Sequence, residues 1–226
     1  MAKNVLTYNL SEPLDGSTTA KVAINMVDGN LTVDGNLTVD GFTGGEPVLA
    51  SGALQYLEKQ GAPRRSLDGN GGKANFTLKS GDHGQPWFRF PWDACNGATT
   101  WMVHLNPSIA LDVAAHTGGG NVQLDLTGMT VSRLAADTGG GNMRVTLPDN
   151  AAGLSVSAKS GAGNVVIRVP EGMAARIQAH SGLGKVIMDP RFVKVDANTY
   201  QSPDYASAGS KIEISASSGA GNVSIE

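Results

Sequence analysis

A glycine-rich phrase that returns five times is the feature that most constrains the fold of this chain. The phrase opens with Ser or Thr, places Gly before a polar residue, and runs into alternating apolar residues, as in Ser160-Gly-Ala-Gly-Asn-Val165. The first four copies begin 21, 22 and 21 residues apart, and the fifth begins 37 residues after the fourth. A fixed period of this size is typical of solenoids, in which each repeat buries its apolar face against its neighbours. The copies begin at Thr117, Thr138, Ser160, Ser181 and Ser218.

Each repeat contains two runs of alternating apolar residues, one before the phrase and one after it. Alternation of period two places these side chains on one face of a strand, and the glycines between the runs permit a sharp turn. The sequence therefore predicts an all-β parallel β-helix, or β-solenoid, with coils of about 21 residues. Residues 111 to 188 are expected to form consecutive coils. One interior column should contain Val122, Met143, Val165, Val186 and Val223.

An asparagine recurs at the end of the phrase, and two interpretations of it remain open. The asparagines could form a ladder that strengthens stacked strands, or they could cap the tight turns. Lys185 interrupts the series in the fourth copy. Both interpretations give these residues a structural role. The residues are Asn121, Asn142, Asn164 and Asn222.

The repeat pattern continues to the last residue, so we expect residues 1–226 to form a single β-solenoid domain. Its expected parts are an N-terminal arm (1–20), degenerate coils with excursions (21–110) and regular repeats (111–226) with an insertion at 189–210. The stretch Pro63 to Asp68 is interpreted as a further excursion. Large aromatic residues are expected to fill a wider end. They are Trp87, Phe88, Phe90, Trp92 and Trp101.

Several phrases in order resemble a known family. They are the Ser-Gly-Ala-Gly-Asn-Val phrase, the following Pro170-Glu-Gly-Met173, and the segment before the first regular repeat, Trp101-Met-Val-His-Leu-Asn-Pro-Ser-Ile109. Over roughly residues 20 to 226 the chain resembles the toast-rack, or putative-adhesin, β-solenoid family, which includes the C-terminal domains of LiaF-type cell-envelope stress proteins. The resemblance implies a single-stranded right-handed β-helix, no known catalytic residues and a link to the cell envelope.

The nucleophilic candidate is Cys95, with His83 or His104 as a base. No third orienting group has a recognisable spacing, so a packed thiol is the preferred interpretation. His116 and His180 share one repeat phase and are expected on a solvated outer face. We therefore expect no enzymatic activity.

Three aspartates six residues apart are the candidate for a calcium site. Asp28, Asp34 and Asp40 are each followed by glycine. The pattern lacks the known calcium-repeat and calcium-loop forms, and Asp-Gly is also a turn signal. We expect no metal and no cofactor, with calcium at these aspartates left open.

Composition excludes some partners. A net charge of -3 gives no basic field, so a nucleic acid partner is not expected. No apolar run is long enough to span a membrane, and the first residues lack the pattern of a secretory signal. We expect a cytoplasmic protein by default, or one that reaches the cell surface by a non-classical route.

The first functional hypothesis is a structural protein that self-associates head-to-tail, an arrangement that does not close and would build filaments. The last repeat ends next to the C-terminus, so Val223 and Ile225 are expected at an uncapped strand edge. The N-terminal arm could complete that edge in a neighbouring copy. The alternatives are an adhesin-like module that binds an envelope glycan or protein, and an envelope-stress regulatory domain. The arm residues proposed for assembly are Val5, Leu6, Tyr8 and Leu10.

Overall fold

The computed structural model describes residues 4–37, 47–81 and 99–226. Some residues that the sequence singled out lie outside these ranges, and the structure gives no test of them. They are Asp40, His83, Trp87, Phe88, Phe90, Trp92 and Cys95.

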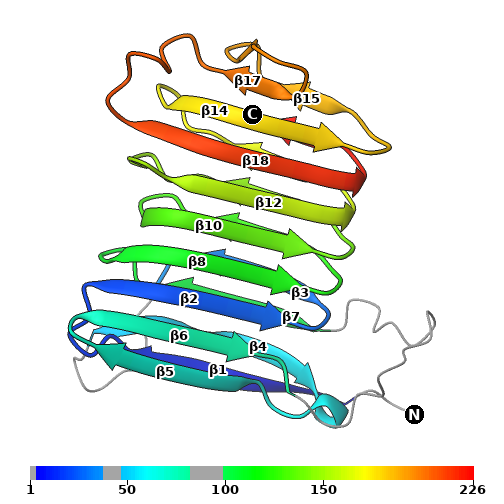
Figure 1. The fold of residues 1–226 in the computed structure, drawn as a ribbon. Coiled ribbons are helices and arrows are strands. Elements are labelled where there is room, and N and C mark those ends of the chain that lie inside the picture. The colour runs from blue at the N-terminus through cyan, green and yellow to red at the C-terminus, as the bar shows by residue number, and fades with distance from the viewer. Residues whose placement is uncertain (1–3, 38–46, 82–98) are drawn as a thin grey trace.

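The described strands form two sheets that face each other, one of nine strands and one of ten (Figure 1). In spatial order, sheet A contains β1 (Val5–Pro13), β4 (Val48–Leu57), β7 (Thr100–Leu105), β3 (Asn30–Asp34), β9 (Val122–Asp125), β11 (Met143–Thr146), β13 (Val165–Arg168), β19 (Val223–Ile225) and β15 (Val186–Met188). Sheet B contains β16 (Val193–Lys194), β17 (Thr199–Gln201), β14 (Ala174–Ser181), β18 (Lys211–Ala220), β12 (Ser155–Ala162), β10 (Thr130–Thr138), β8 (Ala110–Thr117), β2 (Thr19–Met26), β6 (Lys73–Lys79) and β5 (Arg64–Asn70).

The regular part is a stack of coils, each with one strand in sheet B and one in sheet A. We number them by position: coil 1 (19–34), coil 2 (110–125), coil 3 (130–146), coil 4 (155–168), coil 5 (211–225) and coil 6 (174–188). Neighbouring coils pair in parallel within both sheets. The all-β prediction is confirmed, with a short 3-10 turn at Glu58–Gln60 (η1).

The predicted interior column is confirmed. Val122, Met143, Val165 and Val223 are register partners across β9, β11, β13 and β19, and all are at least 99% buried. Val186 continues the column in β15 but is partly exposed, because coil 6 ends this side of the stack.

The predicted order of the coils is wrong at one step. Residues 111 to 188 are not consecutive coils, because coil 5, which comes last in the sequence, lies between coils 4 and 6. The strand β18 pairs with β12 on one side and with β14 on the other, as Figure 1 shows.

The N-terminal end of the stack is built from antiparallel strands that lack the repeat phrase. In sheet A, β1 pairs with β4 and β4 with β7, and in sheet B, β5 pairs with β6. The stretch Pro63 to Asp68 is therefore not an excursion, since most of it lies in β5. Arg65 on β5 forms an ion pair with the buried Glu12 on β1, and Glu12 raises the pKa of the guanidinium above its usual value. Trp101 is fully buried, as expected of the wide end.

The insertion at 189–210 covers the other end of sheet B. Its strand β17 pairs antiparallel with β14, and β16 pairs with β17. Phe192 from the same segment is buried in the core. The insertion thus supplies strands where the sequence predicted an irregular excursion.

The expectation of an uncapped C-terminal edge at Val223 and Ile225 is wrong. Both residues are at least 99% buried, and β19 pairs with β13 on one side and with β15 on the other. No edge of β19 is therefore left to recruit another strand. In the arm, Leu10 is buried, Tyr8 is half-buried, and Val5 and Leu6 are exposed at the outermost strand of sheet A.

Candidate binding surface

A row of asparagines joins successive coils along sheet A. The side-chain oxygen of Asn121 accepts a hydrogen bond from the backbone N–H of Asn142 at 2.9 Å, and Asn142 accepts from Asn164 at 3.0 Å. Asn164 accepts from Asn222 at 2.8 Å, and Asn222 accepts from the backbone N–H of Lys185 at 2.9 Å. Each bond ties a side chain to the backbone of the next coil, so the row runs in the spatial order of the coils.

The row includes one asparagine that sequence reasoning missed. The side-chain oxygen of Asn30 in coil 1 accepts from the backbone N–H of Asn121 at 3.0 Å. The signal was the Gly-Asn pair at positions 29 and 30, which matches the end of the repeat phrase. Hereafter the asparagine row means Asn30, Asn121, Asn142, Asn164 and Asn222.

A second row of hydrogen bonds explains why the phrase opens with Ser or Thr. In each phrase this hydroxyl donates to the carbonyl of a glycine in the preceding coil, for example from Thr138 to Gly120 at 3.0 Å and from Ser218 to Gly163 at 2.7 Å. Sequence reasoning gave these residues no role, although their recurrence was the available signal. The hydroxyls belong to Thr117, Thr138, Ser160, Ser218 and Ser181.

The asparagine row borders an open hollow of about 410 Å³ on the outer face of sheet A. The side chains of Asn121, Asn142 and Asn164 are exposed, and their oxygens are occupied by the next coil, so their amide N–H groups remain available as donors. Gln123 and Arg144 also line the hollow and are register partners on β9 and β11. The hollow therefore presents several hydrogen-bond donors and one permanent positive charge.

A second outward column lies at the opposite end of the same strands. Asp34 on β3 and Asp125 on β9 are register partners. His104 on β7 contacts Asp34, with 2.6 Å between Nδ1 and the carboxylate oxygen. In coil 4, Arg168 lies 3.8 Å from the carboxylate of Glu226. The polar character of this face therefore extends beyond the hollow.

His116 and His180 lie on the outer face of sheet B. His116 and Asp137 are register partners whose side chains meet at 2.7 Å, and both are about half exposed. Lys159 and Ser217 continue the column before His180. The solvated face that the sequence predicted for His116 and His180 is confirmed.

The proposed aspartate cluster does not form around the residues that the structure describes. Asp28 precedes β3 and Asp34 ends it, so the two lie at opposite ends of one strand. Their Asp-Gly segments are not superposed turns of two coils. Within the ranges 4–37, 47–81 and 99–226, no group of three or more His, Cys, Asp or Glu side chains could hold a metal ion. In the same ranges, no helix is long and apolar enough to cross a membrane.

Fold and surface together define an all-β protein of stacked two-strand coils with a regular row of outward amides. Residues 1–168 match the family model described as the N-terminal domain of toast_rack, DUF2154. The chain belongs to the toast-rack family, as the sequence phrases suggested. The family is not an enzyme family.

One solved structure shares the architecture over nearly its whole length. A structure from Clostridium sporogenes, described as a "putative cell adhesion protein", has a TM-score of 0.84 at 19% identity and covers 98% of this chain and 99% of its own. A "putative adhesin" from Bacteroides fragilis covers 100% of this chain and 98% of its own at 11% identity, but its TM-score of 0.34 carries no argument. No curated protein matches the sequence. At 19% identity, the likeness to the Clostridium sporogenes structure shows the fold alone.

Proposed function

We propose that this protein is a non-enzymatic, adhesin-like binding module of the cell envelope, and that it binds an extended envelope glycan along the asparagine row. The observation that carries the proposal is the regular spacing of the exposed amides beside the hollow on sheet A. Family membership and the name of the Clostridium sporogenes structure support a role at the envelope.

The chemistry of the row suits a periodic polar polymer. Successive amides are one strand spacing apart, about 4.8 Å, which is comparable to the length of one sugar unit in an extended chain. Amide N–H groups donate to the hydroxyl and acetamido oxygens that glycans carry. Arg144 adds a charge-assisted bond to any carboxylate on the polymer.

The test is sedimentation of the protein with isolated bacterial cell walls and with purified glycan chains. The double substitution Gln123→Ala and Arg144→Ala should weaken binding about tenfold, since two good polar contacts are worth roughly 1 kcal/mol or a little less each. The matched control is Arg133→Ala with Lys159→Ala on the outer face of sheet B, which should bind like the original protein. Equal binding by both double variants, or no binding to any glycan, would remove the proposal.

End-to-end self-association is a second candidate because apolar side chains are exposed at both ends of the stack. The strand β15 is the outermost strand of sheet A at one end. Ile187 within it is 51% exposed, and Leu183 just before it is 87% exposed. Val5 is 39% exposed and Leu6 36% exposed on β1, the outermost strand at the other end. Pairing of β15 with β1 of the next copy would continue sheet A in a head-to-tail filament. An envelope-stress regulatory role remains a prediction.

A further inference from the structure

Coil 5 fills a slot whose walls both come earlier in the chain. One wall is β12 and β13 of coil 4, and the other is β14 and β15 of coil 6. Because synthesis runs from the N-terminus, the residues of both walls are made before residues 211–226. The slot is thus formed by one part of the chain and filled by another.

The two walls match coil 5 in the same register. Ala216 of coil 5 is opposite Ala158 on one wall and Ala179 on the other. Backbone hydrogen bonds join coil 5 to both walls. The N–H of Val165 donates to the carbonyl of Asn222 at 2.8 Å, and the N–H of Val223 donates to the carbonyl of Lys185 at 2.9 Å. The slot therefore recognises the backbone and small side chains of residues 211–226, which every copy of the chain carries.

The hydroxyl and asparagine rows continue through the slot without interruption. Ser218 donates its hydroxyl to Gly163 on one wall, and Ser181 on the other wall donates to Gly221 of coil 5, both at 2.7 Å. Asn222 is bonded to both walls through its backbone N–H and its side-chain oxygen. A segment that enters the slot must present this same series of groups.

Residues 203–210 form the linker that brings coil 5 to the slot, since the preceding Ser202 is buried and bonded to Ala175 of coil 6. Most of them are exposed, and their links to coil 5 are local: Tyr205 donates to Glu213 at 2.8 Å, and the Lys211 amine donates to the carbonyl of Ala206 at 3.2 Å. The bond to Glu213 raises the pKa of the Tyr205 hydroxyl above its usual value. Eight extended residues reach roughly 26 Å, enough to carry coil 5 to an adjoining molecule.

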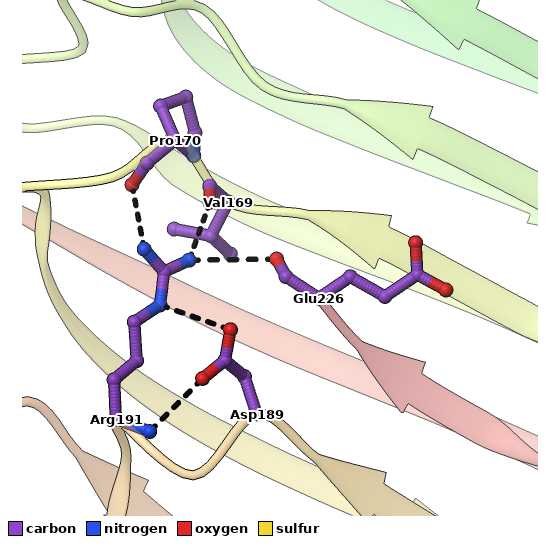
Figure 2. A network of polar contacts seen from close by, with 5 residues as sticks. All are labelled: Val169, Pro170, Asp189, Arg191 and Glu226. Carbon is purple, nitrogen blue, oxygen red and sulfur yellow. Dashed lines mark hydrogen bonds and ion pairs between the residues drawn. The ribbon is translucent and has the colours of Figure 1, made fainter.

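The guanidinium of Arg191 contacts the three segments that follow coils 4, 5 and 6, as Figure 2 shows. It donates to the carbonyls of Val169 and Pro170, which follow coil 4, and to the carbonyl of Glu226, which follows coil 5. The carboxylate of Asp189, which follows coil 6, lies 3.5 Å from its Nε. Arg191 would bind the end of coil 5 in the same way whichever molecule supplied that coil.

We propose that the slot accepts residues 211–226 of a second copy of this chain, so that two copies exchange coil 5 and form a closed dimer. Exchange replaces every contact of coil 5 with an identical one. The free-energy difference between the monomer and the exchanged dimer therefore depends only on the linker and on the protein concentration. The partner is a second copy because residues 211–226, which pair in register with both walls, are present in every copy of the chain.

The test uses two full-length variants, both with Cys95→Ser. One carries Lys159→Cys on β12 and the other Ser217→Cys on β18, which are register partners on the outer face of sheet B. The two variants are unfolded, mixed, refolded together and oxidised. Exchange places a cysteine of one chain beside a cysteine of the other, so we expect disulfide-linked pairs of unlike chains.

The matched control replaces the Lys159→Cys chain with an Asn25→Cys chain, since Asn25 lies in the same outward column three coils further away. The cross-linked yield with Lys159→Cys should exceed that of the control at least tenfold. Equal yields would indicate random surface encounters and overturn the proposal. It is also overturned if no interchain product forms while a single chain carrying both Lys159→Cys and Ser217→Cys closes its own disulfide.

Discussion

At the scale of single residues, the glycine before each asparagine marks the closest approach of two coils. Gly163 has a φ of +142°, and a Cβ placed on it would lie 2.1 Å from the carbonyl oxygen of Gly141 in the preceding coil. The same glycine supplies the carbonyl that accepts the Ser218 hydroxyl. The phrase thus combines a backbone shape that only glycine adopts easily with a donor and an acceptor at fixed places.

We expect Gly163→Ala to destabilise the protein by about 3 kcal/mol or more, because it adds a steric clash with backbone to the strain of a positive φ. The matched control is Gly153→Ala, whose φ is +73° but whose added Cβ meets no atom within 4 Å. That variant should lose only about 1 to 2 kcal/mol from backbone strain. Urea unfolding measures both free energies. Equal losses would show that the contact between coils 3 and 4 is not tight at this glycine.

At the scale of elements, Lys185 disfavours one alternative order of the coils. The backbone N–H of Lys185 donates to Asn222, but its own side chain offers no oxygen to a further coil. If coil 6 instead lay directly on coil 4, with coil 5 beyond it, the N–H of Asn222 would face Lys185 without an acceptor. Such a loss costs about 0.5 to 1.5 kcal/mol. The lysine that interrupts the series in the sequence therefore ends the row in space.

We expect Lys185→Asn to allow part of the protein to refold with coil 6 directly on coil 4. The reporter is a chain with Cys95→Ser, Lys159→Cys and His180→Cys, since β18 separates the two cysteines in the observed order. Adding Lys185→Asn should increase the intrachain disulfide after refolding several-fold. Lys185→Ala is the control, because it removes the charge and supplies no acceptor. A yield that is the same for Asn and Ala would contradict this role.

The sequence predicted the strands of the regular coils but not their neighbours. The apolar alternation placed Val165 and Val223 in one interior column, and the structure confirms it. The predicted order of the coils was wrong because every copy of the phrase can pair in the same register. Periodicity alone therefore does not identify which coils are adjacent. At the N-terminal end, β1, β4 and β5 carry no phrase. The antiparallel pairing of β1 with β4 and of β4 with β7 joins segments that are distant in sequence, whereas β5 and β6 form a local hairpin that turns at Gly71 and Gly72. The right-handed sense implied by the resemblance remains a prediction.

The candidate surface was predictable in its residues but not in its chemistry. The asparagines were identified from their phase, whereas the roles of Gln123 and Arg144 depend on which strands lie side by side in sheet A. Asn30 was missed because residues 35–109 separate coil 1 from coil 2 in the sequence, although the two coils pack together. Spatial adjacency of this kind is not encoded in the spacing of the phrase.

At the scale of the whole molecule, the two ends of the stack differ. At the N-terminal end, β1 and β5 are joined by the ion pair of Arg65 and Glu12, and Tyr8 accepts a hydrogen bond from Arg65 at 2.9 Å. At the other end, the insertion covers the edge of β14, while the outer edge of β15 has no partner strand among residues 4–37, 47–81 and 99–226. Unpaired edges beside exposed apolar side chains are typical sites of strand addition.

If copies associate end to end, the double substitution Leu183→Asp and Ile187→Asp should abolish the association, because charges at a strand edge oppose pairing. Sedimentation over a hundredfold range of concentration should show the average mass of the original protein rising steadily, as an open head-to-tail assembly requires. The variant should stay at the monomer mass.

The control is Val27→Asp with Met102→Asp, two apolar residues that are each 45% exposed and lie outside β1 and β15. This control should associate like the original protein. A constant monomer mass for the original protein would end the filament hypothesis, and a mass that levels off at a dimer unaffected by the end substitutions would instead match exchange of coil 5.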